Sequence, residues 1–395
     1  MKFSAFIDFL LEYSVPLIAG VLLALLFANI APESYATFLH QWPHPTLPFS
    51  FLINDIFTVF FFGLVTAEIT QNGLPGGSLH PLKKAINPIF GTVGGVLMPI
   101  AVYLIVVAIT GEKSLLPGWG IPTATDIALA YLVARAAFGK NHPAVSFLLL
   151  LAIADDGIGL LIIALFYPNP AHPIQPIFLL LVMAGMVTAY LLRRKQTTSF
   201  WPYLLFGGCI SWMGLYLSGL HPALALVPII PFLPAGHGAP AEQAAPAEFV
   251  AVAGQAQPTS VSGKTAPLDR FEIFFRKPVM LGLIGFGLAN AGVSLTAIGP
   301  ATWAVLLSLV IGKTAGVFIF SFIATLFGFP LPLGMTLKTL FVAGMIAAMG
   351  MTVALFVAGV AFTDPALQGA AKMGALFSSG MAPVVLLLAK KMKLS

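Results

Sequence analysis

The sequence is poor in charge. Only 8% of its 395 residues are Asp, Glu, Lys or Arg, whereas a soluble domain carries about 25%. This scarcity excludes an ordinary water-solvated surface, a disordered chain and a nucleic-acid-binding protein. Cysteine is scarcer still, since Cys209 is the single one. A framework of disulfides within the chain is therefore excluded as well.

Hydrophobic residues make up 58% of the chain. A helix needs about 20 apolar residues to cross a bilayer, and charge-free stretches such as 157–192 and 278–312 are long enough for two crossings each. Divided at Gly and Pro, the chain gives about twelve crossings, so we predict an all-α polytopic membrane protein. The predicted spans are 14–31, 51–70, 87–109, 121–138, 144–167, 174–194, 199–218, 220–233, 278–297, 301–326, 335–361 and 366–389.

The basic residues orient these spans. With the N-terminus in the cytoplasm, only Lys113 falls outside the cell, and Lys313 and Lys372 fall within or at the edge of spans. The other Lys and Arg residues, sixteen of the 19, lie on the cytoplasmic side, as the positive-inside rule requires. We therefore expect a multi-pass protein of the cell inner membrane with both termini in the cytoplasm. The net charge of +5 reflects topology rather than a binding patch.

One segment has a different composition. Residues 234–270 are rich in Ala, Pro, Gly and Gln, which is typical of a flexible linker. We predict a cytoplasmic linker there, between an N-terminal transmembrane block over 1–233, of about eight helices, and a C-terminal block over 271–395, of about four. The two blocks are expected to form one functional transport unit. Residues 40–50 are proline-rich and predict an external loop with an interfacial Trp42.

Several charged residues lie where lipid is expected. Asp126, the pair Asp155–Asp156 and Lys313 fall inside predicted spans, and Glu68 closes the second span. An Asp or Lys at mid-membrane costs about 2.5–3.5 kcal/mol, so these side chains need partners, water or a cation. Three Asp and one Lys at such positions favour a functional site. Glu68 is equally compatible with a solvated edge residue.

Two predicted spans contain helix-breaking sequence. Pro122 and the threonines before Asp126 predict an interruption in the fourth span. The glycine-rich segment 344–352 predicts another in the eleventh. Interrupted helices in corresponding halves indicate a binding site near the bilayer midplane. Asp126 could instead only cap the broken helix halves.

Several motifs carry a family resemblance over nearly the whole chain. Ile121–Ala128 (IPTATDIA), Ala152–Asp156 (AIADD), Ala289–Leu295 (ANAGVSL) and Ile311–Lys313 (IGK) occur in register. They resemble the signature segments of the NhaA-type sodium/proton antiporters. The resemblance implies twelve helices, inverted repeats and two crossed discontinuous helices.

The resemblance also implies roles for individual residues. Asp156 and Asp155 match the aspartates that bind the cation and the proton, and Na⁺ would bind at this pair. Thr125 and Asp126 match the unwound segment of the first broken helix, where Asp126 would offset the helix dipoles. Lys313 matches a lysine that pairs with the first aspartate, and it would serve as an ion-pair partner or as a carrier of a proton.

Two residues depart from the family pattern. Glu68 matches a glutamate of the cytoplasmic funnel that is associated with the response to pH. The family has a basic and an acidic residue three and four positions later, where this chain has Gln71 and Asn72. We therefore expect an altered pH response. The 40–50 loop is short where the family has a β-hairpin used in dimer contacts, which leaves a homodimer open.

The charges suggest a mechanism by themselves. Adjacent carboxylates in a low dielectric repel each other, so at least one holds a proton at some working pH. Na⁺ prefers the same oxygen ligands, and competition at a site opened to each side in turn is antiport. We predict a Na⁺ or Li⁺/proton antiporter that exports the cation, needs no cofactor and is not an enzyme. A sodium-coupled symporter of an organic solute and a non-transporting Na⁺ or pH sensor are the alternatives.

Overall fold

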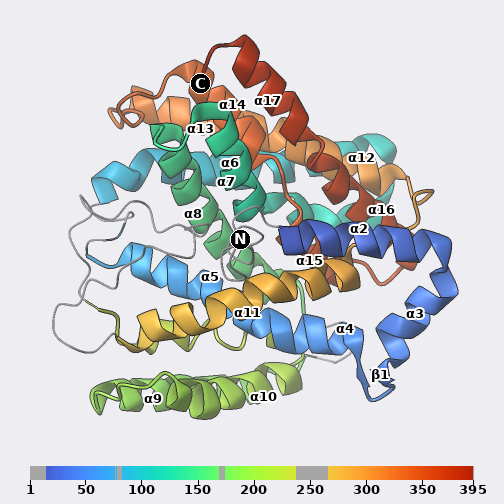
Figure 1. Ribbon diagram of the computed structural model, residues 1–395, viewed down its shortest axis with the longest axis vertical. Helices are drawn as coiled ribbons and strands as arrows, with labels where there is room; N and C mark the ends of the chain where they lie inside the picture. Colours follow the sequence, from blue (N-terminus) through green and yellow to red (C-terminus); the bar gives the residue numbers. More distant parts are fainter. Residues whose placement is uncertain (1–14, 76, 78–81, 169–173, 237–265, 395) are drawn as a thin grey trace, which may run out of the picture. The chain divides into compact units, whose positions relative to one another are not determined.

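The computed structural model describes residues 15–75, 77, 82–168, 174–236 and 266–394, and these residues are almost entirely helical (Figure 1). They form two compact units. Unit 1 comprises Met1–Gly77 and Leu160–Gly292, and unit 2 comprises Ser78–Gly159 and Val293–Ser395. Each unit contains segments from both predicted blocks. The two compact units therefore do not coincide with the two blocks predicted along the sequence.

Most of the predicted linker, residues 237–265, lies outside the described residues. Its described end differs from the prediction, because helix α11 (Pro267–Asn290) begins inside the range 234–270. Pro267 occupies the first helical turn, where its missing N–H would have had no intrahelical partner. The helix therefore starts before the charge-free stretch 278–312, from which the span 278–297 was predicted.

Unit 1 is built around helices that approach closely. Helix α2 (Val15–Ile30) packs along α11 (Figure 1). A Cβ at Gly287 would lie 2.7 Å from the backbone nitrogen of Val21, so only glycine permits this contact. Helix α9 (Leu179–Arg194) lies beside α10 (Cys209–Ser218). The other elements are α3 (Pro32–Gln41), β1 (Pro43–His44), β2 (Leu47–Pro48), α4 (Phe49–Phe51), η1 (Leu52–Phe57), α5 (Thr58–Gly73), η3 (Pro176–Phe178), η4 (Tyr203–Gly208), η5 (Pro222–Leu224) and η6 (Ile230–Phe232).

Unit 2 is organised by α6 (Leu82–Thr110), which packs on α13 (Thr314–Leu326). At their crossing, a Cβ on Gly94 would collide with the carbonyl oxygen of Gly316, and a Cβ on Gly316 would collide with that of Gly94. The two backbones are thus in direct contact. The other elements are η2 (Lys113–Thr123), α7 (Ile127–Phe138), α12 (Pro300–Leu307), η7 (Ser308–Lys313), α14 (Leu337–Ala347), α15 (Thr352–Ala361), α16 (Pro365–Ser378), α17 (Met381–Lys391) and α8 (Pro143–Phe166), which is part of unit 2 through Gly159.

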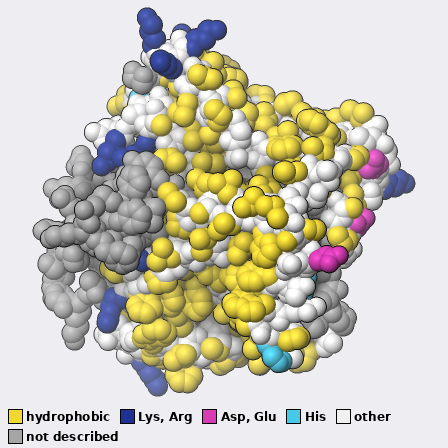
Figure 2. All heavy atoms as spheres, turned by 45° about the vertical axis from the view of Figure 1, so that its right-hand side comes forward, with side chains coloured by type: hydrophobic (Ala, Val, Ile, Leu, Met, Phe, Trp, Pro, Cys, Tyr) yellow, Lys and Arg dark blue, Asp and Glu magenta, His cyan; other side chains and the backbone are white. Residues whose placement is uncertain are grey.

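The apolar helices confirm a multi-pass membrane protein. Within the described residues, six helices are long and apolar enough to cross a membrane, or eight if two bent pairs each count as one span. Hydrophobic side chains predominate on the face shown in Figure 2. The predicted span 220–233 contains only the short 3₁₀ turns η5 and η6. Prolines at 222, 228 and 231 explain this, because they cannot donate the backbone hydrogen bonds of a continuous helix.

The proline-rich 40–50 segment is more ordered than a loop. Strands β1 and β2 pair antiparallel, with Pro43 opposite Pro48 and His44 opposite Leu47. The hairpin is only two residues deep. The segment thus contains a minimal β-hairpin that the sequence did not predict, and Trp42 is exposed.

Candidate functional site

Two pairs of helices in unit 2 are interrupted. Helices η2 and α7 meet at an angle of 56°, and α14 and α15 meet at 46°. Both interruptions lie where the sequence predicted them, beside Asp126 and within 344–352. The first half-helix begins at Lys113, upstream of the predicted residue 121. It is a 3₁₀ helix and includes Pro117 and Pro122.

The two interruptions are joined by hydrogen bonds. The backbone N–H of Asp126 donates to the carbonyl of Met349 at 2.8 Å, and the Thr125 hydroxyl donates to the carbonyl of Ala347 at 2.9 Å. The N–H of Gly350 donates to Ser378 Oγ on α16 at 3.1 Å. Helix ends leave backbone groups unpaired, and here each interruption supplies partners for the other.

The Asp126 carboxylate sits between two helix N-termini. Its Oδ1 accepts the N–H of Leu129 at 3.0 Å in α7, and its Oδ2 accepts the N–H of Thr352 at 3.3 Å at the start of α15. Both helices direct their partial positive charge at this buried carboxylate. The geometry matches the interpretation that Asp126 balances the broken helices.

Asp155 and Lys313 form a fully buried ion pair. Lys313 Nζ lies 2.6 Å from Asp155 Oδ2, and both side chains are 0% exposed. The lysine also donates to the carbonyl of Thr123, at the last residue of η2. Lys313 ends the π-helical turn η7 inside a continuous helix. Such turns frequently occur at functional sites, and no motif in the sequence predicts this one.

Asp156 and Thr125 complete the group. Asp156 is 5% exposed, and its charge acts on Lys313. Thr125 contacts the Asp155 carboxylate through its backbone and side chain. The structure thus brings the predicted residues of unit 2 together around the interruptions. Among the described residues, no cluster of three or more His, Cys, Asp or Glu could hold a metal ion.

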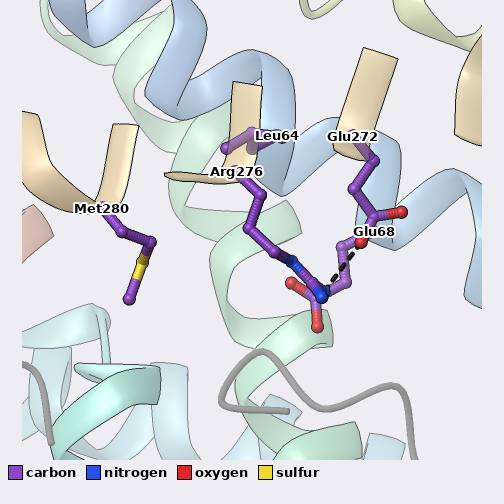
Figure 3. A pocket seen from close by; sticks show the side chains of 5 residues that line it. All are labelled: Leu64, Glu68, Glu272, Arg276 and Met280. Atoms are coloured by element: carbon purple, nitrogen blue, oxygen red, sulfur yellow. Dashed lines mark hydrogen bonds and ion pairs between the residues drawn. The ribbon is translucent and has the colours of Figure 1, made fainter. Parts of the chain in front are cut away.

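Glu68 belongs to a different group, in unit 1. It lines a small pocket with Leu64 on α5 and with Glu272, Arg276 and Met280 on α11. The side chains of Glu272 and Arg276 point towards Glu68 (Figure 3). Arg276 Nη2 lies 2.8 Å from Glu272 Oε1. Glu68 is buried, which contradicts the alternative of a solvated edge residue.

Sequence reasoning missed two features. Gln71 Nε2 donates to Asp269 Oδ1 at 3.2 Å, across 198 positions of the chain. The only sequence feature that pointed to Gln71 was that it replaces the family's basic residue. Lys372 lies well inside the apolar span Pro365–Lys391 and is buried. The predicted span begins at residue 366, one residue from the observed start, so its boundary was correct; the burial of Lys372 comes from the packing of α16 against other helices, which the sequence does not show.

This arrangement defines a class of protein: a polytopic membrane protein in which discontinuous helices surround buried carboxylates and a lysine. The family follows from the sequence as a whole. The chain belongs to the Na⁺/H⁺ antiporter 1 family, whose model matches residues 6–389.

Similar proteins cover almost the entire chain. It is 56% identical over 384 residues to the Na(+)/H(+) antiporter NhaA of Desulfitobacterium hafniense, covering 97% of this chain and 95% of that protein. It is 54% identical over 380 residues to Na(+)/H(+) antiporter NhaA 1 of Pelobacter propionicus, covering 96% of each. A solved structure, the sodium proton antiporter MjNhaP1 of Methanocaldococcus jannaschii, matches with a TM-score of 0.49 and 14% identity over 97% of this chain and 99% of that one.

Proposed function

We propose that this protein exchanges Na⁺ or Li⁺ for protons by alternating access, exporting the cation. Family membership supports the reaction. The observation that carries the assignment is the buried Asp155–Lys313 pair, with Asp156 beside it and two interrupted helices around it. The proposal includes twelve crossings, inverted repeats, crossed discontinuous helices, both termini in the cytoplasm and residence in the cell inner membrane.

In the proposed mechanism, Asp155 and Asp156 bind either the cation or protons. When the cation binds between the carboxylates, Asp155 turns from Lys313 to the cation, and the lysine releases its proton. Because the carboxylates cannot hold both ligands, each cation that leaves is replaced by protons from the other side. If both Asp156 and Lys313 change protonation, the exchange is electrogenic. Thr125 offers a hydroxyl oxygen beside the cation, and Asp126 keeps the helix ends in place.

Glu68 is proposed to act apart from ion binding. Its carboxyl group faces Glu272 and Arg276 in a pocket of unit 1, where changes of protonation would alter the balance of charge. We propose that this group contributes to the pH response.

The test uses everted membrane vesicles and a fluorescent pH dye. Adding Na⁺ or Li⁺ should dequench the dye when the parent protein is present, and Asp156→Asn should abolish the response because one ligand carboxylate is lost. Asp364→Asn is the matched control. Asp364 is exposed and caps α16, and Asn caps helices equally well, so exchange should be retained.

Normal exchange in a well-expressed Asp156→Asn protein would contradict the assignment of the site. Dequenching that requires an organic solute would indicate a symporter. Na⁺ binding without any proton movement would indicate a sensor.

A further inference from the structure

Lys372 is a second buried lysine in unit 2, and the proposed mechanism leaves it unused. It lies in α16 and is 8% exposed. In the part of the chain that the structure describes, its ammonium group has no ion pair and no hydrogen bond. A charged residue inside a membrane span is costly and is usually retained for function.

Among the described residues, the helices that pack against α16 carry no carboxylate that could compensate Lys372. Helix α16 packs against α12, α15, η2 and η7. Helices α12 and α15 carry no titratable side chain, whereas η2 carries Lys113 and η7 carries Lys313. On its own helix, Asp364 is exposed and accepts the N–H of Ala366 at 2.8 Å. The charge on Lys372 is therefore not neutralised locally.

Helix α16 leads from Lys372 to the interrupted helices. Ser378, six residues later, bonds the N–H of Gly350, which places Lys372 about 9 Å along the helix axis from that interruption. Gln368, one turn before Lys372, donates to the carbonyl of Gly359 at 2.8 Å, so this face of α16 lies against α15. The N-terminus of α15 in turn bonds Asp126.

The buried charges of unit 2 leave room for one cation. Asp126, Asp155 and Asp156 contribute three negative charges when ionised, and Lys313 and Lys372 contribute two positive ones. While both lysines are protonated, the set carries one net negative charge, which favours the entry of a monovalent cation. If Lys372 were neutral, the set would carry two.

We propose that Lys372 is a positioning residue whose positive charge sets the affinity of the unit 2 carboxylates for both Na⁺ and protons. The inference rests on the proposed function. At an effective dielectric constant of about 20, a unit charge on the order of 10 Å from a site changes the affinity of that site for a monovalent cation by roughly tenfold. The effect acts equally on Na⁺ and on the competing proton, because both carry one positive charge.

This equality gives a distinctive pH dependence. Replacing the lysine by a neutral residue should strengthen Na⁺ binding about tenfold at alkaline pH, where protons do not compete. At acidic pH each competing proton gains by the same factor, so the apparent Na⁺ affinity should no longer be strengthened. The pH at which protons begin to compete should rise by about one unit.

The experiment measures the KM for Na⁺ in proteoliposomes from about pH 6 to about pH 9. Thermal stabilisation of the purified protein by Na⁺ provides a second, transport-free readout. Lys372→Met and Lys372→Gln remove the charge, and Lys372→Arg keeps it. The control is Lys338→Met, because Lys338 is exposed on α14 of the same unit and solvent screens its charge.

The proposal expects about a tenfold lower KM at alkaline pH, and no lowering of KM at acidic pH, in whichever neutral variant folds. Lys372→Arg and Lys338→Met should retain the parental values. A neutral variant with the parental KM at alkaline pH would overturn the proposal, as would Lys372→Arg behaving like Lys372→Met or an equal change at all pH values. Absence of Na⁺-dependent exchange in the parent protein would instead refute the proposed function.

Discussion

Removing Lys313 should strongly destabilise the protein. Its ammonium group lies 2.6 Å from Asp155 Oδ2 with neither side chain exposed, and it is also bonded to the carbonyl of Thr123. Removing one partner of a buried ion pair costs about 3–5 kcal/mol, since the other charge is left without compensation. We therefore expect Lys313→Ala to lower the unfolding free energy by this amount at neutral pH.

The loss should depend on pH and on Asp155. Without the lysine, the buried carboxylate is relieved by taking up a proton, so the loss should be smaller at acidic pH. The double variant Asp155→Asn/Lys313→Met contains neither charge and fills much of the lysine volume. Its unfolding free energy should be closer to that of the parent than either single variant's, because replacing a buried pair by neutral groups is often tolerated.

The assay is unfolding of the purified protein in detergent, followed by circular dichroism at two pH values. The pair Arg276–Glu272 provides the control, since it is spaced four residues apart on α11 and is partly exposed at 32% and 19%. Glu272→Gln should cost less than about 1 kcal/mol, because the pair is partly exposed and Glu68 still faces Arg276. The reasoning is refuted if Lys313→Ala is as stable as the parent at neutral pH, or if the double variant is no more stable than Lys313→Ala.

Three further predictions concern transport and pH. Asp126→Asn should weaken exchange by about tenfold, a smaller loss than that caused by Asp156→Asn, because Asn still caps a helix N-terminus; equal abolition in vesicles would make Asp126 a direct ligand. Burial raises the pKa of Asp269, and Gln71→Arg should lower that pKa by placing a cation beside it. The added stability, about 0.5 kcal/mol, should be present at neutral pH and lost as the carboxyl protonates on acidification; an unchanged stability–pH profile would contradict this. If Lys313 carries a proton, exchange by Lys313→Ala should become nearly insensitive to membrane potential in proteoliposomes, and parental sensitivity would exclude that role.

Chemically distinctive residues made much of the site predictable. Carboxylates and a lysine in apolar sequence are visible without a structure, and Pro122 marks the first interruption through its missing N–H. The pairing of Asp155 with Lys313 followed from the need of each buried charge for a partner. The position of the second interruption followed from its glycines.

Features that depend on packing were not predictable in this way. The burial of Glu68 depends on α11, which lies about 200 positions further along the chain. Local hydrophobic patterns do not reveal packing between segments so far apart. The same holds for the contact between Gln71 and Asp269. Hydropathy placed a span at 220–233 because its residues are apolar, but prolines limit that segment to short turns. The burial of Lys372 likewise depends on the helices that pack against α16, and not on where α16 begins.

The glycine crossing of α6 and α13 has a consequence for how this sequence can vary. At most packed positions, a larger side chain on one helix can be offset by a smaller one on its neighbour. The nearest atom that a Cβ at Gly94 or Gly316 would meet is the backbone carbonyl oxygen of the other glycine, so no side-chain substitution on the opposite helix can make room for a methyl group at either position. The two residues thus constrain each other without any side-chain contact between them, and neither can be replaced unless the helices themselves move apart.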